Sequence, residues 1–512
     1  MEEVLEPQID DIQAKGLAKN AVGFWSSVTI GLNSTAPAFS LAATLGWLVA
    51  AVGNQSPALM LVAFIPMAFT AVAYRELNRV IPDCGTTFTW ATKAFGPAIG
   101  WMGGWGIAVT GIIFVANAAD IVGIYTLNFV AQVIGQGEAD WLDSRLLVMA
   151  IGVAFTWLMV WITYRGLEGS AKLQRLLVVV QYAALAALAG SAIYAFTQGE
   201  AIEGAEAFSW SWLNPFAVAD SSALVEGLLL AIFIYWGWDT VLSINEETVD
   251  SHRTPGRAAV MSTVLLLGIY VLVTIGLQMY AGVGENGLAN PDTIDDVFAV
   301  IGVPLLGSWG GPALILVVLL SAAASLQTTI MPTARSTLAM AVYKALPERF
   351  ADIHPKYLSP SYSTIMMGVV GTTFYVVFKF LSENLLQDTI LSIGLSIAFY
   401  YGITGLSAAW YFRKDALDSV RSFFVLFFMP LLGGLVLAFV FVLSAIDMWA
   451  TDYGYTVIFG IGGAFVMGMG SLLVGVVLML VWRSMAPSFF RGETLHRDTP
   501  VLVPDDGARE SG

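Results

Sequence analysis

Long apolar runs, separated by short polar segments, extend over almost the whole chain. A transmembrane helix needs about 20 consecutive, mostly apolar residues, and runs of this length recur from residue 22 to residue 482. The pattern predicts an all-α polytopic membrane protein with twelve transmembrane helices. The predicted spans are 22–50, 57–74, 97–134, 144–163, 172–197, 222–248, 258–282, 311–342, 362–382, 386–412, 422–445 and 455–482.

The charged residues in the connecting segments predict how these spans are oriented. Lys and Arg gather in the cytoplasmic loops of membrane proteins. With a cytoplasmic N-terminus, all of the 23 Lys and Arg residues except Arg145 and Lys379 fall on the cytoplasmic side. Dividing the run 97–134 into two spans would destroy this asymmetry. We therefore expect a multi-pass protein of the plasma membrane with both termini in the cytoplasm.

The composition agrees with a bilayer environment and excludes several functions. Hydrophobic residues make up 57% of the chain and charged residues only 12%, whereas soluble domains carry about 25% charged residues. The net charge of −15 is the opposite of a nucleic-acid-binding surface. The chain contains no GxxxxGK[ST] motif, which argues against ATP-driven transport.

Few residues are suited to catalysis or to metal binding. Cys84 is the only cysteine and is typical of a small apolar filler. The three histidines, His252, His354 and His496, lack the spacing of metal ligands. We expect no cofactor, no metal site and no enzymatic activity. The expected partners are a small-molecule substrate and the lipid bilayer.

Two predicted spans contain residues that interrupt a helix. Pro37 lies inside the first span, where it lacks an N–H donor and clashes with the preceding turn. Gly237 and Asp239 lie inside the sixth span, beside Tyr235, Trp236 and Trp238. Lipid cannot satisfy the backbone groups that such interruptions free, so these groups must face protein or a cavity.

The two interruptions occupy matching positions in two halves of opposite topology, since span six begins outside when span one begins inside. Paired interruptions of this kind indicate a mid-membrane binding site in inverted-repeat transporters. We expect a cytoplasmic segment 1–20, a first repeat 21–197, a second repeat 198–412, two further helices in 413–483, and a disordered cytoplasmic tail 484–512.

Several motifs resemble those of the amino acid–polyamine–organocation permeases. The sixth span reads Tyr235-Trp-Gly237-Trp-Asp239 and is followed by an Asn-Glu-Glu run at 245–247 and by Pro255. The loop 82–90, Pro-Asp-Cys-Gly-Thr-Thr-Phe-Thr-Trp, is similar to the segment that precedes span three in that family. The resemblance covers spans one to ten and implies the five-plus-five inverted-repeat fold of neurotransmitter-type transporters.

The chain departs from the family pattern at two positions. Aligned on Phe39, the family's substrate-binding Gly-Ser-Gly-Ile-Phe motif is replaced by Thr35-Ala-Pro37-Ala-Phe39, and Pro37 has no amide proton for a substrate carboxylate. Where proton-coupled members carry a lysine in span five, this chain has Gln181, which cannot carry the proton.

These observations predict a secondary active transporter that works by alternating access, most simply for an amino acid or a related amine. One alternative keeps the fold but carries an inorganic cation or an amine without a carboxylate. A channel or membrane receptor is a third possibility. Proton, sodium and ion-independent transport all stay open, as does the oligomeric state.

The residues expected to bind substrate lie at the two interruptions and in the middle of span three. Asp239 would act in transport or would only cap the inner half of span six. Glu246, Glu247, Arg75, Arg79 and Arg335 lie near cytoplasmic ends and suggest an inner ion-pair network. The substrate candidates are Ser34, Thr35, Ala36, Pro37, Ala38, Ile107, Gly111, Phe233, Tyr235, Trp236, Gly237, Trp238 and Asp239; the ion or coupling candidates are Gly31, Ser34, Gln181, Ser325 and Asp239.

Overall fold

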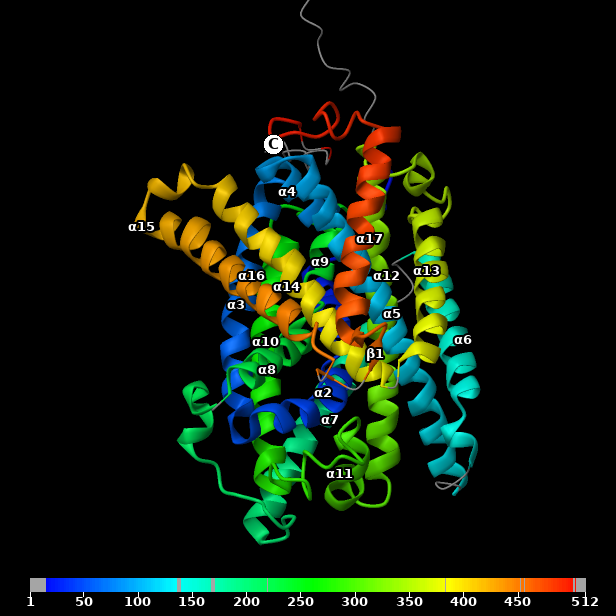
Figure 1. Cartoon of the computed structure of the whole chain (residues 1–512), viewed down its shortest axis with the longest axis vertical. Helices are drawn as coiled ribbons and strands as arrows, with labels where there is room; N and C mark the ends of the chain where they lie inside the picture. The colour runs from blue at the N-terminus through cyan, green and yellow to red at the C-terminus, as the bar shows by residue number, and fades with distance from the viewer. Residues whose placement is uncertain are drawn as a thin grey trace, which may run out of the picture.

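The apolar runs form long helices that pack side by side into one bundle (Figure 1). The computed structural model describes residues 15–135, 140–166, 171–218, 220–382, 384–451, 453–454, 456–500 and 502. Within them, ten helical stretches are long and apolar enough to cross a membrane. The stretch Phe24–Val80 counts as one of these although it contains two predicted spans, and Ser221–Tyr235 is shorter. A polytopic helical membrane protein is thereby confirmed.

The helices follow the predicted spans to within a few residues over most of the chain. Their bounds are α1 Phe24–Thr35, α2 Pro37–Val52, α3 Ser56–Val80, α4 Thr87–Phe95, α5 Pro97–Ile134, α6 Arg145–Tyr164, α7 Ala171–Gln198, α8 Ser221–Tyr235, α9 Thr240–Ser243, α10 Thr254–Ala281, α11 Val297–Leu306, α12 Gly310–Val342, α13 Ser361–Leu381, α14 Leu385–Tyr411, α15 Val420–Ser422, α16 Met429–Asp447 and α17 Gly463–Met485. A π-helical segment, Phe423–Phe428, joins α15 to α16.

Three long helices form the centre of the bundle. The most apolar window of α5 is 89% buried and those of α12 and α14 are 83% buried, whereas the windows of α6, α7 and α13 are 28% buried. Glycine allows the central helices to approach closely: a Cβ on Gly106 of α5 would lie 3.0 Å from the Cβ of Tyr400 on α14. Small residues at helix contacts are typical of membrane bundles.

The last predicted span, 455–482, begins later than the hydropathy suggests. Strand β1 (Val457–Ile458) pairs antiparallel with β2 (Ile461–Gly462), and α17 begins only at Gly463. Phe459 and Gly460 both have positive φ, as a two-residue hairpin turn requires. Two shorter helices, α4 and α11, also lie in segments that the apolar pattern left as loops.

The segment after α17 packs on the end of the bundle that carries α4 (Figure 1). Phe489 and Leu495 are fully buried, and Phe489 stacks on Phe88 with ring centroids 5.3 Å apart. The hydroxyl of Thr494 donates to the Tyr343 carbonyl at 2.6 Å. The polar composition of 484–512 predicted disorder; residues 503–512 lie outside the described residues.

Candidate functional site

The two interrupted helices meet at their breaks. Helix α1 ends at Thr35 and α2 begins at Pro37, with Ala36 between them in the left-handed region at φ 46°. Helix α8 ends at Tyr235, and Gly237 has φ 115°. A Cβ on Gly237 would lie 2.7 Å from the carbonyl carbon and oxygen of Ser34. The two backbones are therefore in direct contact.

Hydroxyl groups connect the break in α1 to the neighbouring helices. The Ser34 hydroxyl shares a hydrogen bond of 2.7 Å with Thr240 of α9. The hydroxyl of Ser325 on α12 donates to the Ser34 carbonyl at 2.6 Å. Two of the ion candidates are thus brought together, and Ser325 bonds across to α1 rather than back to its own helix.

A chain of amide side chains links the last turn of α1 to α7 and α12. Gln181 donates to the Asn33 side-chain oxygen at 3.1 Å and accepts from the Ser321 hydroxyl at 2.7 Å. The Asn33 side-chain amide donates to the backbone and the side-chain oxygen of Gln174. The Gln174 side chain donates in turn to the side-chain oxygen of Gln327 at 3.0 Å. The position that would hold a coupling lysine is therefore a neutral bridge between helices.

Asp239 is buried and does not cap α9. It is 7% exposed, its side chain makes no capping hydrogen bond, and it accepts a hydrogen bond of 3.0 Å from the Tyr400 hydroxyl on α14. Tyr400 in turn accepts from the Trp236 indole at 2.5 Å. The sequence alone gives little reason to select Tyr400, because a tyrosine in an apolar helix carries no signal of which face it occupies.

Aromatic rings gather around the breaks. Trp236 lies 5.1 Å from Phe114 of α5, between ring centroids, and Phe39 lies 6.2 Å from Phe114 and 6.4 Å from Phe233. Tyr235 instead packs on Tyr270 of α10. Since Phe39, Phe114 and Phe233 lie on α2, α5 and α8 and Trp236 follows α8, a movement of these segments would rearrange the cluster.

Some candidates face away from this cluster. A Cβ on Gly111 would lie 2.3 Å from the Thr333 hydroxyl of α12, and one on Gly31 would lie 2.8 Å from the Ser262 hydroxyl of α10. Ile107 is buried in the core. Trp238 packs between Tyr74 and Tyr401. On α5, the residue that contacts the aromatic cluster is Phe114, three positions beyond Gly111.

The remaining candidates line the turn of α1. Thr35 donates its hydroxyl to Leu32. Ala36 and Ala38 are buried, and Pro37 is the first residue of α2. The Phe39 amide donates to the Ser321 hydroxyl at 3.3 Å. The start of α2 therefore offers few amide donors, because Pro37 has none and that of Phe39 is used.

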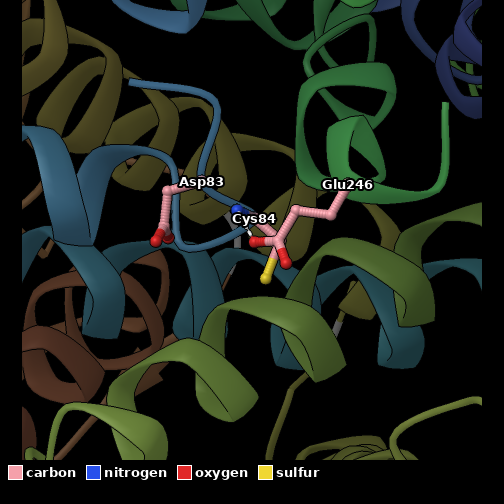
Figure 2. A group of neighbouring side chains, drawn as sticks. All are labelled: Asp83, Cys84 and Glu246. Carbon is pink, nitrogen blue, oxygen red and sulfur yellow. Dashed lines mark hydrogen bonds between the residues drawn. The ribbon is translucent and has the colours of Figure 1, made fainter. Parts of the chain in front are cut away.

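An ion cluster lies at the α4 end of the molecule. The Lys15 ammonium lies 2.7 Å from Asp83 and 2.6 Å from Glu246. The donor atoms of Asp83, Cys84 and Glu246 lie within 4.8 Å of one another, a spacing that could hold a metal ion. Figure 2 shows them converging from the loop before α4 and the turn after α9. The Lys15 ammonium already provides both carboxylates with the positive charge that a metal ion would bring.

A second buried pair lies beside this cluster. Arg335 of α12 binds Glu247 through two hydrogen bonds of 2.5 and 2.9 Å. Arg75 and Arg79 instead pair with Glu76. The sequence suggested an inner network of these charges but missed Lys15, which lies in a polar segment and carries no local signal.

Burial and pairing shift the pKa values of the cluster in opposite directions. Burial raises the pKa of the Asp83 carboxyl, but Lys15 and the hydrogen bonds from Thr89 and Gly85 outweigh it and bring the pKa below its ordinary value. Burial lowers the pKa of the Lys15 ammonium, but Asp83 and Glu246 outweigh it and raise the pKa well above its ordinary value. Both groups are therefore charged at neutral pH.

At the opposite end of the bundle, Asp120 of α5 pairs with Lys379 of α13. Their charged atoms are 2.5 Å apart, and the Tyr375 hydroxyl donates to Asp120 at 3.0 Å. Asp120 is 2% exposed. The ion pair with Asp120 thus accounts for the position of Lys379, one of the two cations that the sequence places on the outer side.

Comparison with known proteins gives consistent matches along the chain. A family model described as amino acid permease matches residues 22–466. The chain is similar to a low-affinity putrescine importer of Escherichia coli K12, with 23% identity over 80% of this chain and 85% of the relative. It is 26% identical to an uncharacterized transporter of Mycobacterium tuberculosis over 91% of this chain and 93% of the relative. It is 24% identical to the large neutral amino acids transporter small subunit 2 of Mus musculus over 81% and 73% of the two chains.

We predict that replacing Lys15 with Met makes stability fall as pH rises between about 5 and 8. In the wild-type protein, Asp83 stops contributing to the free energy of unfolding only as pH falls below about 4. Lys15 stops contributing only as pH rises above about 10. Without Lys15, two buried carboxylates face each other, so at least one has a raised pKa and loses its contribution as pH rises. Thermal unfolding at pH 5, 7 and 9 measures the difference.

Lys19→Met is the matched control, since Lys19 is exposed and lies four residues from Lys15. Its pH profile should follow the wild-type profile. A Lys15→Met protein with the same flat profile would show that the ammonium does not hold the cluster together.

Proposed function

Because the chain belongs to the amino acid permease family, we propose that it is a secondary transporter that moves an amino acid or related amine by alternating access. The direct contact between Gly237 and Ser34 carries this proposal. It brings the two helix breaks together inside the bundle, beside Asp239 and the aromatic cluster, and paired breaks of this kind mark the solute site of inverted-repeat transporters.

The proposed topology has twelve spans, with two inverted repeats of five helices followed by two further helices. The stretch Phe24–Val80 supplies two of these spans, and α8 with α9 supplies the sixth. The distribution of Lys and Arg supports a plasma-membrane protein with both termini in the cytoplasm. The Lys15 and Arg335 clusters would then close the cytoplasmic side of the binding site.

Chemistry at the breaks favours a substrate with an amino group. The Asp239 carboxylate provides a counter-charge, and Trp236 and Phe114 provide ring faces that attract cations. The shortage of amide donors at Pro37 and Phe39 gives little support to carboxylate binding. An amine without a carboxylate is therefore the second candidate, and the relative named as a putrescine importer is named for such a molecule.

Alternating access requires the aromatic and ionic contacts to open in turn. We propose that Phe233 and Trp236 cover the substrate on one side, while Lys15 and Arg335 hold the other side closed. Counterflow of a labelled amine in proteoliposomes tests this proposal. Saturable exchange supports a carrier, and ohmic current would instead indicate a channel.

We predict that Asp239→Asn lowers substrate affinity roughly tenfold to a hundredfold, because a charge-assisted hydrogen bond contributes about 1.5–3 kcal/mol. Folding should change little, since Asn still accepts from Tyr400. Uptake and thermal unfolding are measured on the same preparation. Asp292→Asn, in an exposed outer loop, is the control. Normal uptake by folded Asp239→Asn would remove the carboxylate from the mechanism.

We predict that Gly237→Ala and Gly237→Leu both lose substrate binding. A side chain at φ 115° is strained, and its Cβ would collide with the Ser34 carbonyl. Gly190→Leu is the control, because nothing lies within 4 Å of a Cβ at Gly190. Ligand-induced thermal shifts measure binding in the folded fraction. An unchanged shift in Gly237→Leu would contradict a site at this break.

We predict that an inward sodium gradient does not stimulate uptake. The Ser325 hydroxyl donates to the Ser34 carbonyl that would bind the ion, and the neighbouring Ala324 has no hydroxyl. Ser325→Ala should therefore change uptake equally with and without sodium. Proteoliposomes with separately imposed sodium and pH gradients provide the measurement. Strong sodium stimulation that disappears in Ser325→Ala would establish sodium coupling.

A further inference from the structure

A cavity of about 540 Å³ lies between α6, α7 and α12, apart from the aromatic cluster at the breaks. Its volume falls within the range of roughly 300–1,000 Å³ that is typical of small-ligand sites. Met159 and Ile162 of α6, Leu177 of α7 and Leu320 of α12 line it. Figure 1 shows α6 at the edge of the bundle, and only 28% of its apolar window is buried, so α6 lies on a side that we expect to face lipid.

Two cations and two aromatic rings also line the cavity. Arg165 follows the last residue of α6, and its guanidinium lies 4.5 Å from the ring centre of Trp161. Lys356, in the segment before α13, lies 5.5 Å from the ring centre of Tyr357. Among the described residues, neither cation forms an ion pair. Trp161 is 53% exposed, as expected for a tryptophan at a membrane interface.

We propose that this cavity binds an anionic phospholipid of the surrounding bilayer, with its phosphate at Arg165 and Lys356 and an acyl chain between α6, α7 and α12. Basic pockets between transmembrane helices at the cytoplasmic surface suit anionic headgroups. A cationic substrate would be repelled by the same two side chains. A free inorganic anion would contact only the two cations and would leave the apolar walls of the cavity uncovered.

The bound lipid would contact helices that support the break in α1. Ala323 and Ala324, which also line the cavity, directly precede Ser325 on α12. Gln327 lines it as well and accepts from Gln174, which holds Asn33. An acyl chain packed here would therefore contact the same parts of α7 and α12 that hold the last turn of α1.

The test titrates the purified full-length protein with phosphatidylglycerol or with phosphatidylcholine of the same acyl chains. Thermal unfolding follows stabilisation, which increases with occupancy, and native mass spectrometry counts bound lipid. The wild-type protein should bind phosphatidylglycerol more tightly. The double variant Arg165→Gln/Lys356→Gln should weaken that binding about 30-fold and leave phosphatidylcholine binding unchanged.

Arg413→Gln is the matched control, since Arg413 also lies over a tryptophan, 4.2 Å from the ring centre of Trp410, but does not line the cavity. It should retain wild-type lipid preference. Equal binding of both lipids by the wild-type protein would overturn the proposal, as would an unchanged preference in the double variant. Equal stabilisation by inorganic phosphate alone would overturn the lipid assignment. None of these outcomes depends on which solute is transported.

Discussion

The need to satisfy backbone hydrogen bonds inside the bilayer constrains this structure more than any other interaction. An unsatisfied N–H or C=O in hydrocarbon costs several kcal/mol, so two interrupted helices are stable only where protein groups replace the missing bonds. Ser325 binds the Ser34 carbonyl, Tyr270 binds the Ile234 carbonyl, and Ser321 accepts from the Phe39 amide. The hydroxyls buried on α10 and α12 follow from this requirement.

Ion pairing distinguishes Asp239 from several other acids of the described residues. Asp83 and Glu246 share Lys15, Glu247 binds Arg335, and Asp120 binds Lys379. Asp239 forms no ion pair among these residues and bonds instead to Tyr400. A buried acid without a cation is costly in a membrane protein and is retained for function. Its surroundings therefore suit a cationic group supplied by a substrate.

Local chemistry explains which features the sequence could predict. Pro37 lacks a donor wherever it lies in a helix, and Gly237 permits a backbone that other residues resist, so both breaks were visible in the sequence. Most span limits followed equally from hydropathy. The hairpin before α17 was missed because its strands are as apolar as the helix that follows them.

Contacts between distant segments explain what the sequence could not predict. Lys15 meets Glu246 across 231 positions, and no pattern near either residue indicates the other. The choice between Gly111 and Phe114 depends on the rotation of α5, which its nearly uniform apolar composition leaves undetermined. Membrane helices lose amphipathic signal because lipid and protein interior are both apolar. Residues that face the site are therefore recognised only where a polar group or a helix break marks the face.

The amide chain through Asn33 would hold the last turn of α1 in place and still allow it to move in the proposed alternating-access cycle. Gln181 and Gln174 hold Asn33 by hydrogen bonds, whose net contribution is typically about 1 kcal/mol each. Apolar contacts are less directional than hydrogen bonds and define the position of α1 less sharply. Hydrogen bonds between amides instead define one position and can re-form elsewhere or with water. Since Gln181 is neutral, the movement of α1 in the proposed transport cycle would involve no change of charge at this residue.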